Sequence, residues 1–327
     1  MEKTRIFITR KIHESGINLL KQAGYEVIVY QKNKVIPKKE LYAAAKNADA
    51  LLCLLTDKID KEFLDANTHL KVIANYAVGF DNVDISYATQ KKILITNTPG
   101  VLTEAVAEHT FALMFTITRK IVEADSYLRK GKYKSFEPLG FLGPELKGKI
   151  LGIIGTGRIG YSVAVRAVKG LGMKLIYNDV QRNESLERDA SGEFATVDEL
   201  LKKSDIISIH VPLLPETRHL INAKKLKLMK KTAYLINTAR GPIVDEKALV
   251  SSLQKKQIAG AALDVYEFEP KLSAGLAKLS NVVITPHIAS ATIEARSAMS
   301  NLAAQGIIDV LNGKVPANVV NKEVFRR

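Results

Sequence analysis

The feature that most constrains the fold is a glycine-rich turn between an apolar β-type run and a helical segment. The run Lys149–Ile154 leads directly into Gly155-Thr-Gly-Arg-Ile-Gly160, and a helical pattern continues to about Leu171. A second β-type run, Lys174–Asn178, follows and ends in Asp179. A G-x-G-x-x-G turn that connects a strand to a helix, with an acid after the next strand, predicts the first βαβ unit of a dinucleotide-binding fold.

Each residue of this turn has a predicted physical role. Gly155 allows the tight turn, Gly157 lets a pyrophosphate approach the backbone, and Gly160 lets helix and strand pack closely. Asp179 lies 19 residues beyond Gly160, where a carboxylate can accept hydrogen bonds from the adenosine ribose. The alternative is a plain strand-to-helix turn followed by a solvated acid, since the chain has 20 glycines and chance matches occur. The complete strand, turn, helix, strand and acid series favours the dinucleotide site.

The same acid bears on the choice of cofactor. Asp179 repels the 2′-phosphate of NADP and therefore favours NAD. Arg182, three residues later, is the residue type that accommodates this phosphate, so NADP stays open as the less favoured cofactor.

Both halves of the chain alternate β-branched runs with amphipathic segments, which predicts two α/β domains with parallel sheets. A break at Asn97–Gly100 and a helix from Thr103 to about Lys120 separate the two series. A closing helix near Ala291–Leu311 fits either domain by periodicity alone. The predicted strands are Arg5–Thr9, Glu26–Tyr30, Ala50–Leu55, Lys71–Asn75 and Ile93–Asn97, then Lys149–Ile154, Lys174–Asn178, Ile206–His210, Ala233–Asn237, Gly260–Val265 and Val282–Thr285.

Composition excludes several classes of protein. The 327 residues exceed the usual size of one hydrophobic core, which agrees with two domains. No apolar run is long enough to span a membrane, and the N-terminus lacks the apolar block of a secretion signal. A single cysteine, Cys53, permits no intrachain disulfide, and no His or Cys spacing indicates a metal site. We therefore expect a cytoplasmic protein without a metal.

The net charge of +14 raises nucleic acid as a partner. The densest basic stretches, Lys32–Lys39 and Lys224–Lys231, have no interleaved aromatic residues for base stacking. We expect neither nucleic-acid nor membrane binding, because dispersed lysines suit solubility and attraction of small anions.

Three polar residues follow late strands, at the sheet edge where open parallel sheets bind ligands. Arg240 follows Ala233–Asn237, Glu269 lies in the segment after Gly260–Val265, and His287 follows Val282–Thr285. Arg240 can hold a carboxylate through two hydrogen bonds. His287 can donate a proton to a ketone oxygen, and Glu269 can orient the imidazole and raise its pKa. Taken singly, each is more often a structural loop residue, but their coincidence behind a nucleotide turn favours reduction of a 2-oxo acid.

These motifs together resemble the D-isomer-specific 2-hydroxyacid dehydrogenases over essentially the whole chain. The segments that carry the resemblance are Gly155–Gly160, Asn237–Gly241, Leu263–Val265, Glu269–Pro270 and Thr285–Thr292. Leu51–Leu55 and Asn75–Asp84 are most similar to the glyoxylate and hydroxypyruvate reductase branch.

The resemblance implies two Rossmann-like or flavodoxin-like domains, with the NAD-binding domain, residues 101–288, inserted into a substrate-binding domain of residues 1–100 and 289–327. It implies a cleft with hinges near Gly100 and Ile288, and a homodimer to which the helix from Thr103 contributes. By position, Arg240, Glu269 and His287 match the catalytic residues, and Leu55, Val78 and Gly79 match the substrate pocket. The matching cofactor contacts are Gly155, Gly157, Arg158, Ile159, Gly160, Asp179, Thr238, Ala239, Asp264, His287 and Ser290, with Asp264 expected to hold the nicotinamide amide.

The implied activity is reduction of glyoxylate or hydroxypyruvate with NADH, with the proton coming from His287. D-lactate and D-3-phosphoglycerate remain alternative hydroxy acids, although residues up to Arg327 leave no room for the regulatory domain that many phosphoglycerate dehydrogenases carry. A second alternative is an NAD-responsive scaffold, because the related C-terminal binding proteins keep the same three residues. One departure from the family pattern is Ala289, where glycine is usual, which bears on the fine position of the nicotinamide ring.

Overall fold

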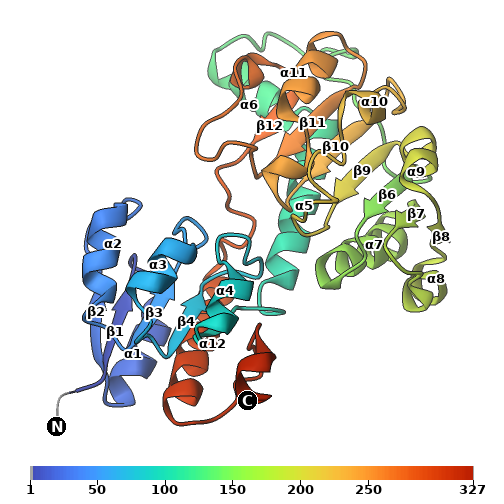
Figure 1. Cartoon of the computed structure of the whole chain (residues 1–327). Coiled ribbons are helices and arrows are strands. Elements are labelled where there is room, and N and C mark those ends of the chain that lie inside the picture. Colours follow the sequence, from blue (N-terminus) through green and yellow to red (C-terminus); the bar gives the residue numbers. More distant parts are fainter. Residues whose placement is uncertain (1–2, 327) are drawn as a thin grey trace. The chain divides into compact units, whose positions relative to one another are not determined.

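The computed structural model describes residues 3–326 and divides into two compact units. One unit contains the chain up to Leu102 together with the segment from Ala291 onward, and the other contains Thr103–Ser290. Both are built around a parallel sheet (Figure 1). The predicted pair of parallel α/β sheets is confirmed.

The discontinuous unit has a five-stranded sheet in the order β2-β1-β3-β4-β5. This is the doubly wound order in which the chain starts in the interior of the sheet and reverses direction beside β1. The strands are β1 (Arg5–Ile8), β2 (Glu26–Val29), β3 (Ala50–Cys53), β4 (Val72–Asn75) and β5 (Leu94–Thr96). The helices between them are α1 (Glu14–Gln22), α2 (Lys38–Ala45), α3 (Lys61–Ala66) and α4 (Ile85–Gln90).

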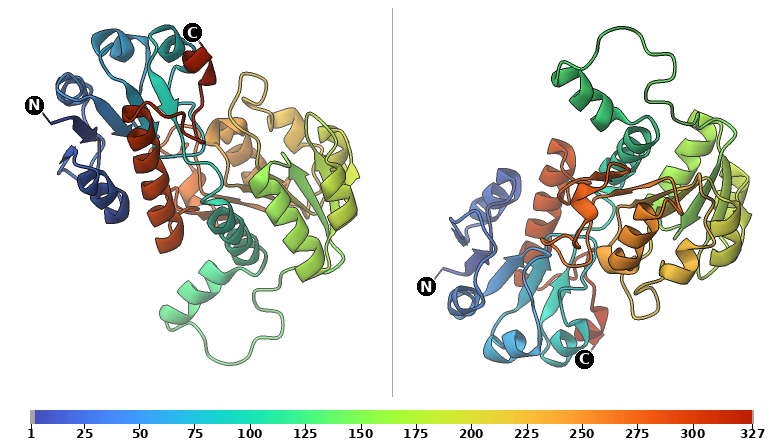
Figure 2. Two further views of the ribbon diagram at one scale, coloured as in Figure 1. Left: turned by 90° about the horizontal axis from the view of Figure 1, so that it is seen from below. Right: turned by 90° about the horizontal axis from the view of Figure 1, so that it is seen from above.

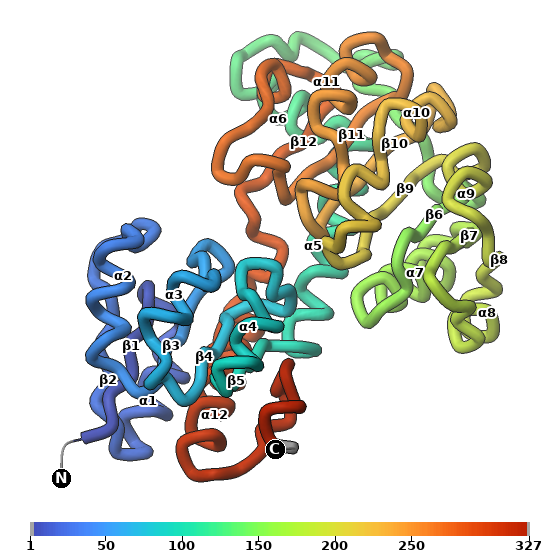
Figure 3. The backbone as a smooth tube through the Cα atoms, viewed as in Figure 1, coloured from blue at the N-terminus to red at the C-terminus, as the bar shows by residue number. Residues whose placement is uncertain are grey.

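The closing helix, α12 (Ile293–Leu311), belongs to this unit, as its path beside the N-terminal strands shows (Figure 3). Its packing on α1 is close, since a Cβ added at Gly16 would lie 2.2 Å from the carbonyl oxygen of Ser300. The backbone N–H of Gly16 donates to the Ser300 hydroxyl at 3.2 Å. Periodicity could not assign this helix because its buried face consists largely of small residues, which fit many partners equally well.

The continuous unit has a seven-stranded sheet in the order β12-β11-β10-β9-β6-β7-β8. Counting from β6 this is the dinucleotide-binding order, with the reversal of direction between β6 and β9. The strands are β6 (Ile150–Ile154), β7 (Lys174–Asn178), β8 (Glu193–Phe194), β9 (Ile206–Ile209), β10 (Tyr234–Asn237), β11 (Gly260–Leu263) and β12 (Val282–Ile284). The helices are α5 (Thr103–Thr118), α6 (Ile121–Arg129), α7 (Arg158–Leu171), α8 (Glu184–Ala190), α9 (Val197–Lys203), α10 (Ala223–Leu226) and α11 (Glu246–Gln254).

Both faces of this sheet are buried. Ile207 and Leu235 contribute to one apolar cluster, whereas their strand neighbours Ile206 and Ile236 contribute to a second. Because successive side chains of a strand point to opposite faces, these two clusters lie on the two sides of the sheet. Continuous apolar strands are what a parallel sheet covered on both sides requires.

The sequence patterns did not predict α6 or the two-residue strand β8, nor did they assign the helices α8 to α11 individually. No residue of α6 is buried, and Ile121, Val122 and Leu128 are exposed. The helix and the loop after it extend away from the sheet of their own unit (Figure 2).

Within residues 3–326, no helix is long and apolar enough to cross a membrane. Over the same range, no group of three or more His, Cys, Asp or Glu side chains is arranged to hold a metal ion.

Candidate active site

The glycine-rich turn has the geometry that the sequence indicates. Gly155 adopts φ +94°, a left-handed conformation that favours glycine. A Cβ on Gly160 would lie 2.0 Å from the carbonyl oxygen of Gly155, so only glycine permits this close approach. Gly157, at the start of α7, has no atom within 4 Å of an added Cβ and no side-chain cap. The start of the helix is therefore an open cradle of backbone N–H groups, which fits a pyrophosphate.

Asp179 lies immediately after β7, beside this turn. One carboxylate oxygen accepts hydrogen bonds from the backbone N–H of Thr156 at 2.6 Å and from its hydroxyl at 2.7 Å. The other accepts the N–H of Val180 at 2.7 Å. These bonds fix the carboxylate at the strand end, and the oxygen that accepts only the Val180 N–H keeps a lone pair for a further donor. The cradle and the fixed acid together fit an adenosine diphosphate group.

His287 and Glu269 form the central pair of the candidate active site. The Nδ1 atom of His287 lies 3.0 Å from a carboxylate oxygen of Glu269. The other oxygen of Glu269 accepts the backbone N–H of Tyr266 at 2.9 Å, which fixes the acid in its own loop. His287 adopts φ +55°, and its N–H donates to the carbonyl oxygen of Asp264 at 2.9 Å. Such a conformation is uncommon for histidine and needs support from its surroundings.

Asp264 supplies much of that support. Its side chain is fully buried. One oxygen accepts the Thr285 hydroxyl at 2.6 Å and the N–H of Ile288 at 2.9 Å, and the other accepts the N–H of Ala289 at 2.8 Å. Burial raises the pKa of Asp264, but these hydrogen bonds and one from His109 outweigh it, so the pKa is lowered. The expected role of Asp264 toward the nicotinamide amide stays a prediction, because its oxygens face this loop.

Arg240 lies three residues after the end of β10 and is half-buried. The side-chain amide of Asn237 donates to its carbonyl oxygen at 2.9 Å. The next residue, Gly241, packs against the segment before Glu269, because an added Cβ would lie 1.9 Å from the carbonyl carbon of Tyr266. Arg240 and Glu269 are thus carried by two segments in direct contact.

The two residues between Asn237 and Arg240 are predicted cofactor contacts. The hydroxyl of Thr238 lies 3.1 Å from that of Thr110, and the N–H of Ala239 donates to the Asn237 side chain at 3.0 Å. Ser290, the last predicted contact, is half-buried at the end of the unit.

The predicted substrate-pocket residues lie in the other unit, after β3 and β4. The carbonyl oxygen of Val78 accepts the Asn97 amide at 2.8 Å, and that of Gly79 accepts the Asn75 amide at 2.8 Å. Both hydrogen bonds use carbonyl oxygens of the loop, so they anchor the loop without involving the backbone N–H groups of Val78 and Gly79. Leu55, two residues after β3, is half-buried.

Comparison with known proteins agrees with this geometry. Residues 111–289 match the family model described as "D-isomer specific 2-hydroxyacid dehydrogenase, NAD binding domain". A glyoxylate reductase of Thermofilum pendens is 51% identical over 329 residues, which span 100% of this chain and 97% of that protein.

The chain belongs to the D-isomer-specific 2-hydroxyacid dehydrogenase family.

Two solved structures extend the comparison. A Thermus thermophilus protein superimposes with a TM-score of 0.91 at 40% identity, covering 97% of this chain and 100% of that one. An NADPH-dependent glyoxylate/hydroxypyruvate reductase of Sinorhizobium meliloti, in complex with NADP and malonate, gives a TM-score of 0.86 at 30% identity, covering 100% and 99%. Family membership makes the chain an NAD-dependent oxidoreductase.

Sequence reasoning did not connect His109 of this dehydrogenase to the site. A histidine on the apolar face of a helix suggests a packed residue. In the structure its Nε2 lies 3.1 Å from the Thr285 hydroxyl and 3.4 Å from a carboxylate oxygen of Asp264. Tyr266 was also missed, and its hydroxyl donates to the Thr285 carbonyl oxygen at 2.7 Å. For His109 the available signal was a polar residue within an apolar helix, and for Tyr266 it was the position between Asp264 and Glu269.

His210 also lies near the glycine turn, but it differs in its protonation from what we expect of His287. It follows β9 beside the glycine turn, and its Nε2 lies 2.8 Å from the hydroxyl of Ser208. Burial lowers its pKa to about 3, so the imidazole is neutral at physiological pH. His210 is therefore not a proton donor of the kind that we expect at His287.

Proposed function

We propose that this dehydrogenase reduces glyoxylate or hydroxypyruvate to the corresponding D-2-hydroxy acid with NADH. The observation that carries the proposal is the His287–Glu269 pair, 3.0 Å apart, in a domain whose glycine turn fits a dinucleotide. A carboxylate on Nδ1 fixes the tautomer and orientation of the imidazole, which leaves Nε2 to meet a substrate.

The chemistry assigns one task to each of three residues. NADH, held by the glycine turn and Asp179, would supply a hydride to the carbonyl carbon. His287 donates the proton from Nε2 to the carbonyl oxygen, which becomes the hydroxyl of the product. Glu269 stabilises the imidazolium before that transfer, and Arg240 holds the substrate carboxylate.

We further propose that the N–H groups of Val78 and Gly79 bind the same carboxylate and that Leu55 lines the pocket beside it. The carbonyl oxygens of this loop are already bonded to Asn75 and Asn97, which supports a loop held rigid for an anion. In this proposal, residues 1–100 and 289–327 form the substrate domain and residues 101–288 form the nucleotide domain.

The proposed cofactor contacts surround the two ends of NAD. Gly155, Gly157, Arg158, Ile159 and Gly160 bind the pyrophosphate, and Asp179 binds the adenosine ribose. The proposed contacts at the nicotinamide end are Thr238, Ala239, Asp264, His287 and Ser290.

Steady-state kinetics with glyoxylate, hydroxypyruvate, pyruvate and 3-phosphohydroxypyruvate test the function. We expect Arg240→Ala to raise KM steeply and His287→Gln to lower kcat by about 10²–10⁴-fold. His69→Gln and Arg188→Ala are the matched controls and should keep wild-type constants. Feeble NADH oxidation with every 2-oxo acid would instead support a nucleotide-responsive scaffold, and a preference for one of the last two acids would reassign the substrate.

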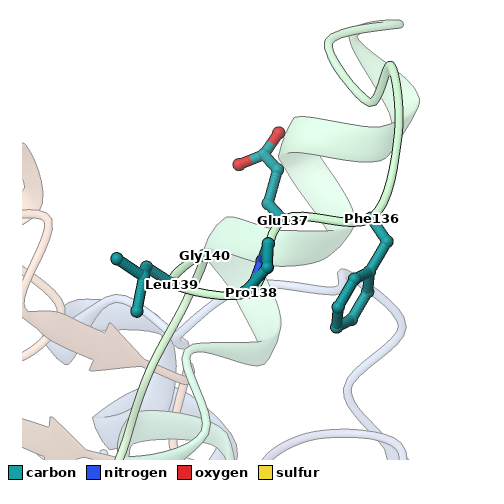
Figure 4. A pocket seen from close by; sticks show the side chains of 5 residues that line it. All are labelled: Phe136, Glu137, Pro138, Leu139 and Gly140. Atoms are coloured by element: carbon teal, nitrogen blue, oxygen red, sulfur yellow. The ribbon is translucent and has the colours of Figure 1, made fainter.

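We also propose that the protein is a homodimer, in which α6 and the loop after it extend the interface expected from the helix that begins at Thr103. The loop exposes Phe136 and Leu139 at 80% and 83%, around the hollow that also contains Glu137 and Pro138 (Figure 4). Apolar side chains this exposed are typical of an interface. Tyr133, Leu142 and the apolar residues of α6 extend the same surface. A second copy is the proposed occupant because no residue of α6 is buried, so its apolar side chains stay exposed to solvent.

A cytoplasmic location completes the proposal. Cys53 is a buried free thiol, and its pKa is raised by burial, which fits a protein kept in a reducing compartment.

A further inference from the structure

Arg182 lies in the loop that follows Asp179, at the edge of the proposed adenosine site. The loop is tied to the glycine turn, because the side-chain amide of Asn183 donates to the carbonyl oxygen of Thr156 at 3.2 Å. An arginine in this loop is the residue type that binds the 2′-phosphate of NADP.

The structure gives Arg182 another partner. Its Nε donates to a carboxylate oxygen of Glu187 in α8 at 3.0 Å. Its guanidinium also lies over the ring of Phe194, 5.6 Å from the ring centre. The guanidinium thus contacts Glu187 of α8 through its Nε edge and Phe194 of β8 through its face.

Glu187 is itself held in place. The hydroxyl of the buried Tyr177 donates to the same carboxylate oxygen at 2.5 Å and accepts the N–H of Asn183 at 2.9 Å. The Arg182 guanidinium and the Tyr177 hydroxyl lower the pKa of Glu187, so it is ionised at neutral pH. The carboxylate is 28% exposed and cannot swing freely to follow the arginine.

We propose that Glu187 is a specificity-determining residue that retains Arg182 against α8 and so disfavours a cofactor with a 2′-phosphate. Asp179 repels that phosphate, and Glu187 withholds the cation that could compensate for the repulsion. The inference deepens the proposed function, because it rests on the nucleotide site of the same domain.

Nucleotide binding measured by calorimetry separates this role from a merely structural one. We expect Glu187→Gln to strengthen NADPH binding about tenfold, the size of a freed charge-assisted contact, and to change NADH binding by less than about twofold. Adenosine 2′,5′-bisphosphate should also bind more tightly to Glu187→Gln, whereas the affinity for AMP should not change. This difference assigns the gain in affinity to the 2′-phosphate. Glutamine keeps the oxygen to which Tyr177 donates, so the fold is preserved, but it removes the negative charge that retains the guanidinium.

A control variant and a double variant complete the experiment. Glu193→Gln removes the same charge from an exposed pair with Lys203, at 2.8 Å, in the same unit, and should leave both affinities unchanged. Arg182→Ala in the Glu187→Gln background should abolish the NADPH gain. An unchanged NADPH affinity in Glu187→Gln, or a gain that survives Arg182→Ala, overturns the inference while leaving the proposed function intact. Failure of the wild-type protein to bind NADH would overturn both.

Discussion

Replacement of Asp264 by asparagine tests how the loop that carries His287 is held. The change is isosteric but exchanges one acceptor oxygen for an NH₂ group. In the structure both oxygens accept buried donors, namely Thr285 and Ile288 on one and Ala289 on the other. In either amide orientation, therefore, an NH₂ group must face at least one N–H or O–H donor.

The expected cost follows from that count. An unsatisfied buried donor costs about 1–3 kcal/mol, and at least one loop donor and one amide hydrogen lose their partners. We expect Asp264→Asn to lower the free energy of unfolding by about 2–6 kcal/mol. Activity should fall as well, because the φ +55° conformation of His287 loses its support.

Urea unfolding followed by far-UV circular dichroism measures this cost at pH 7. Glu193→Gln is the control, since Glu193 pairs with Lys203 on the surface of the same unit and should change the free energy by less than about 0.5 kcal/mol. If Asp264→Asn is as stable as this control, the loop does not depend on the carboxylate and our account of the site is wrong.

The pH dependence has a defined sign. The pKa of Asp264 is lowered below its ordinary value of 3.8, so its contribution is present above that value and is lost as the pH falls through the folded-state pKa. The advantage of the wild-type protein over Asp264→Asn should therefore shrink below about pH 4.

Three further predictions concern other parts of the chain. His210 has a pKa of about 3 in the folded protein, so unfolding takes up a proton between that pH and the ordinary value of 6.5. When the free energy of unfolding is measured across this pH range, its decrease with falling pH should be smaller in His210→Asn than in wild type, by about 1.4 kcal/mol per pH unit. Gly160→Ala should destabilise the protein by about 1–3 kcal/mol and weaken NADH binding, because its Cβ would meet the Gly155 carbonyl oxygen, and an unshifted melting temperature would contradict this. Phe136→Ser with Leu139→Ser should convert a dimer into a monomer in light scattering, with the melting profile of a folded chain; a dimer that persists places the interface elsewhere.

The parts of the fold that can be predicted from the sequence are those determined by contacts between residues close together in the chain. The glycine turn depends on steric contacts within residues 155–160, and β-branched runs mark the strands wherever both faces are buried. The polar residues Arg240, Glu269 and His287 could be grouped because parallel strands place their carboxyl ends at one edge of a sheet.

What sequence could not predict depends on long-range contacts. His109 reaches Asp264 across 155 positions, and no local pattern links them. The helix α6 has an apolar surface with no core of its own to cover, so its periodicity does not indicate a packed face. The pairing of Arg182 with Glu187 depends on where α8 begins and how its first turns face the loop.

The most direct test of the central claim is the product formed from hydroxypyruvate. We expect the wild-type protein to convert one NADH and one hydroxypyruvate into one NAD⁺ and one glycerate of D configuration, and His287→Gln to lose this turnover while still binding NADH. Formation of L-glycerate, or undiminished turnover in His287→Gln, would contradict the assignment of the proton donor and of the site.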